Sequence, residues 1–334
     1  MSLKEYSVQD LLTTLITKNL ANPINPFFMV EDLNKEGVFV ETDNDKCRIM
    51  IGNEFDGLLF RGQNRDWDFT SSYSRITSPL EKCIHWIKKE EFKEFFRTTP
   101  FFYRLQTEIK CRGKEFEFDL EALAQHYEFK TNYLDITKDF TIAMFFAYTD
   151  YINGQYVPID FQNKDKNYEP HIYIANLGIL NVATNNEDLK VVGFQASPRP
   201  LAQKAMAINL SDGADVKNLF AKISLPKNEY FTVGIYNSFK KGYKLFKPDI
   251  LSPFVAKIKE STKISPVLLE RYCEEFNVES AEIKKELAEN NYILENAIHK
   301  LSKEETKNMN KCIDNEILPY IRNYIGHRRV SKPL

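Results

Sequence analysis

In residues 58–68, LLFRGQNRDWD, a short apolar run leads into Arg61, Gly62 and Gln63 and then gives way to polar residues. Such a run predicts a β-strand that ends at this tripeptide. A guanidinium presents a planar fork of donors that matches a phosphate or a carboxylate in a bidentate pair. An arginine at the end of a strand therefore indicates an anion-binding site.

The two residues after the arginine support the same interpretation. Gly62 has no side chain to block a ligand that approaches the backbone. Gln63 adds a donor and an acceptor on the face of Arg61, since residues i and i+2 of a strand share a face. The structural alternative is a buried Arg61 paired with a core carboxylate, or an ordinary strand end.

A second segment, residues 122–137 (ALAQHYEFKTNYLDIT), combines the end of a helix with a short extended run. His126 closes the helix, and a histidine with a pKa of about 6.5 suits a ribose hydroxyl or a proton transfer. Asp135 and Thr137 share one face of the extended run, where a carboxylate can fix a ligand hydroxyl. The structural alternatives are a satisfied helix-end histidine, a cap on the next helix, and packing for Tyr133.

A third segment, residues 194–208 (FQASPRPLAQKAMAI), contains two prolines on either side of Arg199. Proline restricts its own backbone and that of the residue before it, so this part is predicted to be extended. Gln203 opens the strand-like run that follows. Its amide can hydrogen-bond a ligand, or it can be an exposed strand end.

The pattern along the chain predicts an α+β protein with strands in its centre and helices around them and after them. An amphipathic helix begins at Ser7 and ends near residues 22–23, and a tail of charged helices follows residue 260. Further helices are predicted at 79–97, 119–127 with Asp119 as N-cap, 139–152 with Thr137 or Asp139 as N-cap, 229–246, 265–276, 279–289, 291–301 and 303–325. Strands are predicted at 37–43, 47–53, 57–63, 131–137, 154–160, 171–177, 189–195, 202–210 and 220–226.

The composition excludes several classes of protein. With 334 residues, 43% apolar content and a net charge of −2, the chain predicts a large core and no broad electrostatic attraction to nucleic acid or membrane. No run of about 18 apolar residues predicts a membrane span. The five cysteines contain no C-x-x-C pair and do not cluster with histidines, which favours free thiols in a reducing cytoplasm and argues against a metal site. The basic end at 321–334 is a solvated terminus or a nucleic-acid contact.

The three segments together resemble the FRG domain, a bacterial family named for its Phe-Arg-Gly signature. The matching pieces are LLFRGQ, LAQHYEFKTNYLDIT with the apolar helix after it, and RPLAQKAMAI. The third piece departs from the family pattern, because Lys204-Ala205 stands where a glycine is expected. The resemblance covers roughly 55–250. Together with the change to charged helices near residue 260, it divides the chain into an N-terminal part at 1–54, an FRG domain at 55–260 and a helical C-terminal subdomain at 261–334 that lies outside the resemblance.

The order of these pieces is also similar to that of the ADP-ribosyltransferase fold, which implies a mixed, mainly antiparallel β core with flanking helices. By this resemblance Arg61 holds the pyrophosphate of NAD, and Gln203 stands in place of the catalytic acid. A neutral amide stabilises a ribosyl cation less than a carboxylate does, so Asp135 is a candidate for the missing charge. The expected NAD contacts are Arg61, Gly62, Gln63, Tyr133, Thr137 and Arg199, and the expected catalytic residues are His126, Asp135 and Gln203.

Three functions remain open at this point. The first is an NAD-dependent ADP-ribosyltransferase-like toxin or defence protein that cleaves the nicotinamide–ribose bond, with a protein, a nucleic acid or water as acceptor. The second is a non-catalytic module that senses a nucleotide or another phosphorylated small molecule. The third is a nucleic-acid-binding defence effector. For all three we expect a cytoplasmic protein with no membrane contact and no metal. The resemblance also implies a toxin–antitoxin or defence-system partner.

Overall fold

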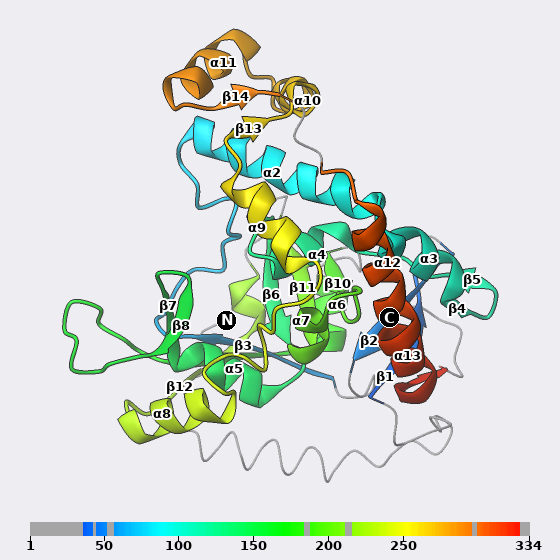
Figure 1. Cartoon of the computed structure of the whole chain (residues 1–334). Coiled ribbons are helices and arrows are strands. Elements are labelled where there is room, and N and C mark those ends of the chain that lie inside the picture. Colours follow the sequence, from blue (N-terminus) through cyan, green and yellow to red (C-terminus); the bar gives the residue numbers. More distant parts are fainter. Residues whose placement is uncertain are drawn as a thin grey trace.

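The computed structural model describes residues 36–42, 45–51, 57–183, 188–210, 216–295 and 299–327. The predicted helix after Ser7 lies outside these ranges, as does residue 328 and everything after it. Within them the chain forms an α+β fold whose strands pair mainly in antiparallel fashion (Figure 1). The predicted fold class is therefore confirmed at this level.

The central sheet places the Arg61 strand between two neighbours. Its strands are β3 (Leu58–Gln63), β6 (Tyr133–Thr137), β9 (His171–Asn176), β10 (Leu189–Val191), β11 (Ala205–Asn209) and β12 (Ala221–Ser224). They are arranged in the order β10-β11-β6-β3-β9-β12, and every neighbouring pair is antiparallel. Arg61 lies opposite Tyr173 of β9, and Phe60 lies opposite Thr137 of β6. The three predicted site segments are thus brought together by β3, β6 and β11.

Smaller sheets surround the central one. Their strands are β1 (Gly37–Glu41), β2 (Cys47–Ile51), β15 (Ile325–His327), β4 (Lys110–Cys111), β5 (Lys114–Glu115), β7 (Thr149–Ile152), β8 (Gln155–Pro158), β13 (Lys263–Ile264) and β14 (Ile293–Leu294). Strand β1 pairs with β2 and, in parallel, with β15, so the two ends of the described chain share one sheet. The tail also contains the pair β13–β14, where the sequence predicted only helices.

Gly62 lets a helix pack against the backbone of β3. Helix α5 (Phe140–Ala147) begins at its N-cap Asp139, one of the two predicted caps. A Cβ atom on Gly62 would lie 1.8 Å from the carbonyl oxygen of Ala143 and 2.9 Å from the amide nitrogen of Ala147. The space beside Gly62 is therefore occupied by α5, and the prediction that this glycine clears a path for a ligand is wrong.

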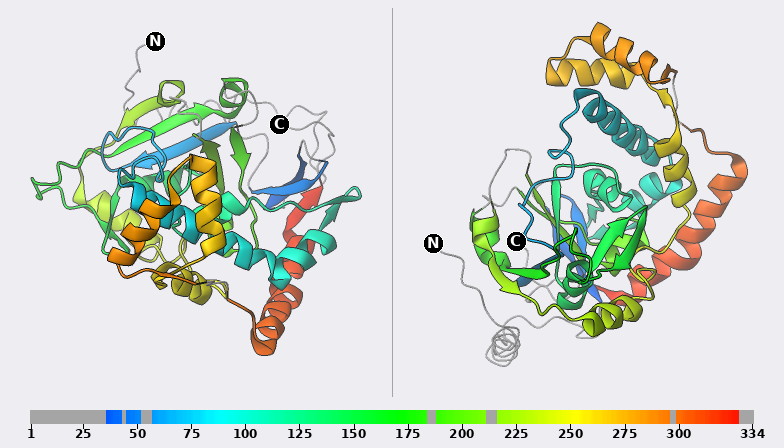
Figure 2. Two further views of the ribbon diagram at one scale, coloured as in Figure 1. Left: turned by 90° about the horizontal axis from the view of Figure 1, so that it is seen from above. Right: turned by 90° about the vertical axis from the view of Figure 1, so that its left-hand side faces the viewer.

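Helix α2 (Pro79–Arg97), which has the predicted bounds, is the element that joins the tail to the main body. On one face, Trp86 and Ile87 share a core with residues of α10 (Pro266–Phe276) and α11 (Ser280–Glu289). On the other, Phe92, Phe95 and Phe96 belong to the main core. Figures 1 and 2 show α10 and α11 at one end of the molecule, with α2 beneath them.

Four consecutive charged residues of α2, at 88–91 (KKEE), are buried. Such charges need partners, because an unpaired ion in the interior is costly. The Nζ of Lys88 lies 3.0 Å from the carboxylate of Glu91. The Nζ of Lys89 lies 2.7 Å from the carboxylate of Glu121 in α4 (Leu120–His126), so the buried charges also connect α2 to the helix that carries His126.

The remaining helices are α3 (Pro100–Glu108), α4 (Leu120–His126), α6 (Leu177–Ala183), α7 (Pro198–Ala202), α8 (Glu229–Ser238), α9 (Ser252–Glu260), α12 (Lys303–Cys312) and α13 (Leu318–Tyr324), with a π-helical stretch at Ile313–Ile317. The prediction of a helix at 291–301 is wrong, because the described residues of this range contain strand β14 and no helix. The helix predicted at 229–246 ends at residue 238. Soon after that end Lys240, Lys241 and Gly242 have left-handed φ angles of 51°, 58° and 89°.

Candidate functional site

A pocket of about 210 Å³ brings together five of the nine predicted site residues. Arg61, His126, Tyr133, Asp135 and Gln203 line it, although they come from separate segments of the chain. Its other walls include Arg75, Glu128, Lys130, Phe146, Tyr151, Tyr156 and Phe246. The pocket thus combines cations, carboxylates and aromatic rings, a set that suits a charged ligand with a planar ring. Gly62, Gln63, Thr137 and Arg199 are not among the lining residues.

Arg61 enters the pocket as a cation whose donors are only partly used. Its Nη1 donates to the backbone oxygen of Asp135 at 2.6 Å, and its buried Nε has no hydrogen-bond partner in the described chain. Burial lowers the pKa of Arg61 to about 10, so the side chain is still charged at neutral pH. No carboxylate among the described residues forms an ion pair with it, which rules out the alternative of a structural pair. Unused donors remain for an anion.

Asp135 supplies a carboxylate to the same pocket from the middle of β6. It is exposed, and its carboxylate forms no hydrogen bond or ion pair with any described residue. Its charge nevertheless acts on its neighbours, because it raises the pKa of Arg61 and that of His126 against the effect of burial. Arg75 acts on Arg61 in the opposite sense. The pocket therefore holds charges of both signs that do not neutralise one another directly.

His126 is buried at the end of α4. The helix begins at the predicted N-cap, since the Asp119 carboxylate accepts from the amide of Ala122 at 3.0 Å. Burial holds the pKa of His126 below its ordinary value; Asp135 partly offsets this effect, and Arg199 adds to it. The imidazole is therefore neutral at pH 7 and can accept a proton or a hydrogen bond.

The depressed pKa of His126 predicts a pH-dependent stability. Below pH 6.5 the unfolded chain binds a proton at His126 more readily than the folded protein does. The contribution of His126 is thus complete above pH 6.5 and is lost as the pH falls through the lower, folded pKa. In urea titrations from about pH 5 to 7, we expect the free energy of unfolding to rise with pH less steeply in His126→Gln than in the wild type. Parallel profiles would contradict the assignment.

Arg199 lies on a helix and not on an extended segment. Ser197 is the N-cap of α7 and Pro198 occupies its first turn, where proline is well tolerated, so the prediction of an extended backbone is wrong. The guanidinium lies 5.1 Å from the ring centre of Tyr127, and Nη1 donates to the backbone oxygen of His126 at 3.1 Å. Arg199 therefore holds the C-terminal end of α4 and does not itself line the pocket.

Gln203 is the C-cap of α7, and one residue separates it from the first residue of β11. It therefore does not open the strand as predicted. Its side-chain Nε2 donates to the backbone oxygen of Leu245 at 3.2 Å. Thr137, which does not line the pocket, holds the backbone of Gln203: its Oγ1 donates to the Gln203 carbonyl at 2.7 Å and accepts from the amide of Asp139 at 3.1 Å. The buried Thr137 thus ties β6 to α7.

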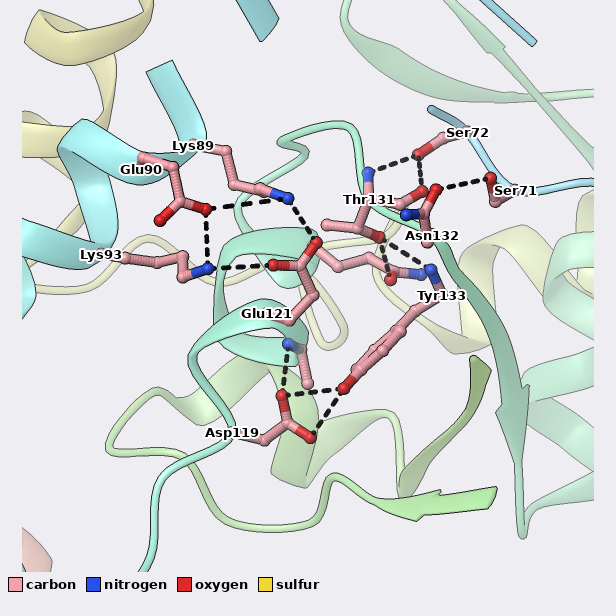
Figure 3. A network of polar contacts seen from close by, with 12 residues as sticks. Ser71, Ser72, Lys89, Glu90, Lys93, Asp119, Glu121, Thr131, Asn132 and Tyr133 are labelled. Atoms are coloured by element: carbon pink, nitrogen blue, oxygen red, sulfur yellow. Dashed lines mark hydrogen bonds and ion pairs between the residues drawn. The ribbon is translucent and has the colours of Figure 1, made fainter. Parts of the chain in front are cut away.

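The helix α4 is anchored by a network of polar contacts, drawn in Figure 3. The hydroxyl of Tyr133 donates to the Asp119 carboxylate at 3.2 Å. Glu121 accepts from Lys89 at 2.7 Å and from Lys93 at 3.3 Å. Tyr133 is therefore both a wall of the pocket and a support for the helix that presents His126.

Gln63 belongs to the sheet and not to the pocket. It is buried opposite His171 of β9, and its Oε1 has no hydrogen-bond partner in the described part of the chain. It shares a face with Arg61, as the strand periodicity predicted. The pocket, however, lies at the position of Arg61 and does not extend along the strand as far as Gln63.

An aromatic wall completes the pocket, and sequence reasoning did not find it. Tyr156 stacks on Phe246 with ring centres 4.6 Å apart and an angle of 16° between the ring planes. Tyr151 lies 4.9 Å and Phe146 5.7 Å from Tyr156, measured between ring centres. Burial raises the pKa of Tyr156, so its phenol is neutral. The only signal in the sequence was the general abundance of Phe and Tyr.

Two further classes of site are not seen in the part of the chain that the structure describes. Over those ranges no cluster of His, Cys, Asp and Glu has the composition to hold a metal ion. Over the same ranges no helix is both long enough and apolar enough to cross a bilayer. A larger pocket of about 320 Å³, lined by Phe39, Leu318 and Ile321 among others, contains none of the predicted site residues, so the pocket around Arg61 is the candidate site.

The fold and the pocket define an α+β protein with a cationic, aromatic-walled pocket at the centre of its main sheet. Residues 56–155 match the family model of the FRG domain, so the chain carries an FRG domain over that range. The matched range contains Arg61, His126 and Asp135 and stops before Gln203. No curated protein and no solved structure matches the chain.

Proposed function

We propose that the pocket binds NAD and breaks its nicotinamide–ribose bond, as an ADP-ribosyltransferase-like enzyme does. One observation carries the proposal: Arg61, His126, Asp135 and Gln203 line a single pocket. A second supports it. The strands β3 and β6, which carry Arg61 and Asp135, and β11, which follows Gln203, are neighbours in the central sheet.

The lining residues supply the contacts that a dinucleotide needs. The unused donors of Arg61, with Arg75 and Lys130 on the same wall, suit a pyrophosphate. The stacked Tyr156 and Phe246 suit an aromatic base or the nicotinamide ring. At about 210 Å³ the pocket is smaller than most small-molecule sites. It would therefore hold one nucleotide half of NAD and leave the other half at its open face.

The proposed reaction breaks the bond between C1′ of the ribose and N1 of nicotinamide. The leaving group takes the electron pair and becomes neutral, while positive charge develops on the ribose. Asp135 stabilises this charge electrostatically. The neutral imidazole of His126 accepts the proton that the attacking water or acceptor loses. With water the products are ADP-ribose, nicotinamide and one proton.

Arg61→Ala is expected to weaken NAD binding by about 10- to 100-fold, because hydrogen bonds to a charged group contribute about 1.5–3 kcal/mol. Isothermal titration with NAD measures the affinity, and chromatography of released nicotinamide measures turnover. Arg97→Ala removes an exposed arginine from the last turn of α2 and is the matched control, which should behave as the wild type. Equal affinities of the wild type and Arg61→Ala for NAD would show that Arg61 does not contribute to NAD binding.

A non-catalytic nucleotide sensor is the second candidate, and one observation favours it. Gln203 is neutral, and its amide nitrogen is already bonded to the backbone oxygen of Leu245, so it is a weak substitute for a catalytic acid. A sensor would leave NAD intact while its melting temperature rises with nucleotide concentration. Nicotinamide release in the same samples would exclude this candidate.

A further inference from the structure

Helix α8 and the segments that flank it, residues 227–247, carry a positive net charge, and we call this segment the basic–aromatic strip. Its lysines all flank the helix, since α8 itself contains none. The strip contains five lysines and one glutamate, a net charge of +4, in a chain whose net charge is −2. The lysines Lys227, Lys240, Lys241, Lys244 and Lys247 are all exposed. The last four form no ion pair with any described residue. Figures 1 and 2 place α8 at the end of the molecule opposite α10 and α11.

Aromatic side chains lie exposed among these lysines. Tyr230 is 84% exposed, Tyr243 54% and Phe231 47%. Within α8 only Thr232 is buried, so most of this helix faces solvent. Proteins that bind single strands of nucleic acid combine these two features: cations follow the phosphates and aromatic rings stack on the bases. Val233 of the same helix is also exposed, at 49%, so a lipid surface is the alternative that the test below separates from nucleic acid.

Two of the lysines occupy positions that disfavour them. Lys240 and Lys241 have φ angles of 51° and 58°, in the left-handed region that glycine and asparagine adopt at lower cost. Backbone strain of this kind is often retained where it serves a function. An exchange of lysine for asparagine at both positions therefore removes two charges without adding backbone strain.

The strip leads directly to the pocket. Phe246 lines the pocket and stacks on Tyr156, and Leu245 accepts the hydrogen bond from Gln203. Four of the five lysines, at 240, 241, 244 and 247, lie within six residues of Phe246 in the sequence, so the positive charge is concentrated in the segment that ends at the pocket.

We infer that the basic–aromatic strip binds single-stranded nucleic acid and presents it to the pocket as the acceptor of the ADP-ribosyl group, an inference that rests on the proposed function. In this step the C1′–N1 bond of NAD breaks and nicotinamide leaves with the electron pair. A nucleophilic oxygen or nitrogen of the nucleic acid forms the new bond to C1′. The proton that this atom loses passes to His126 and then to solvent, so that the products are the ADP-ribosylated strand, nicotinamide and one proton.

The test uses the full chain, labelled 20-nucleotide single strands of RNA and DNA, and fluorescence anisotropy without NAD. Lys240→Asn combined with Lys241→Asn removes two charges at positions where asparagine is well accommodated. We expect about 10-fold weaker binding and a melting temperature that is unchanged or higher. The slope of log affinity against log salt concentration should become shallower by about 1.4. The control, Lys307→Gln with Lys311→Gln on α12, removes the same charge from another exposed surface and should bind as the wild type.

Three results would overturn the inference: no binding by the wild type at about 50 mM salt, an equal loss in the control, or preferential lysine-dependent binding to phosphatidylserine vesicles. A second arm adds NAD labelled in its adenosine half and asks whether label joins the bound strand. Nicotinamide release without transfer to the strand overturns the acceptor role and leaves the proposed function standing. Strip-dependent binding without nicotinamide release overturns the proposed function and, with it, the acceptor role.

Discussion

Replacing Asp135 with asparagine should reduce nicotinamide release by about 10²- to 10³-fold, the loss typical of removing one electrostatic contact to a transition state. Asp135 is exposed in the pocket and already acts on the charges of Arg61 and His126. The neutral amide of Gln203 cannot replace it. Since asparagine keeps the shape of the side chain, the affinity for NAD should change much less than the turnover, and steady-state kinetics separates the two.

Glu128→Gln is the matched control, because Glu128 is a second carboxylate of the same pocket. It is engaged elsewhere: Tyr151 donates to it at 2.9 Å and Lys259 lies 3.2 Å from it. Its loss should therefore leave turnover within a few fold of the wild type. If Asp135→Asn and Glu128→Gln lowered nicotinamide release equally, the effect would belong to the net charge of the pocket and the assignment of Asp135 would fail.

Gly62→Ala should destabilise the folded protein by about 3 kcal/mol or more, at the upper end of what overpacking costs. The added methyl group would lie 1.8 Å from the carbonyl oxygen of Ala143, which is backbone and cannot move aside as a side chain can. Either α5 shifts away from β3 or the strand is displaced, and Arg61 moves with it. Urea denaturation followed by circular dichroism gives the change in the free energy of unfolding.

Gly234→Ala is the control for that substitution. Gly234 lies within α8, and no atom lies within 4 Å of the position of its missing Cβ. Alanine is the better helix former by about 1 kcal/mol, so this variant should be as stable as the wild type or more stable. A Gly62→Ala protein with unchanged stability would show that α5 packs less closely against β3 than the structure has it.

Those elements that local signals define could be predicted from the sequence. Helix α2 has the predicted bounds because Pro79 and a helical spacing of apolar residues mark it. Asp119 and Asp139 begin α4 and α5 as N-caps, since each aspartate precedes an apolar run. The runs GLLFRGQ and TNYLDIT likewise predict the strands that carry Arg61 and Asp135. Their meeting in one pocket follows from the resemblance and not from any local pattern.

The remaining features depend on contacts between distant segments. The aromatic wall joins Tyr156 of β8 to Phe246, and nothing near either residue marks the pairing. The KKEE run at 88–91 is typical of a solvated helix face, and only the helices packed on both sides of α2 bury it. The two prolines around Arg199 predict an extended backbone, whereas Ser197 and Pro198 begin a helix. In each case tertiary packing overrode the local preference.

The two-sided burial of α2 bears on how this protein can be divided. A fragment that stops at residue 260 would keep the matched FRG range and the pocket. It would also leave Trp86 and Ile87 uncovered. Such a fragment would expose an apolar surface of α2 to water, and this surface would favour aggregation. The C-terminal helices are thus an integral wall of the protein, and any recombinant boundary intended to isolate the FRG unit has to include them.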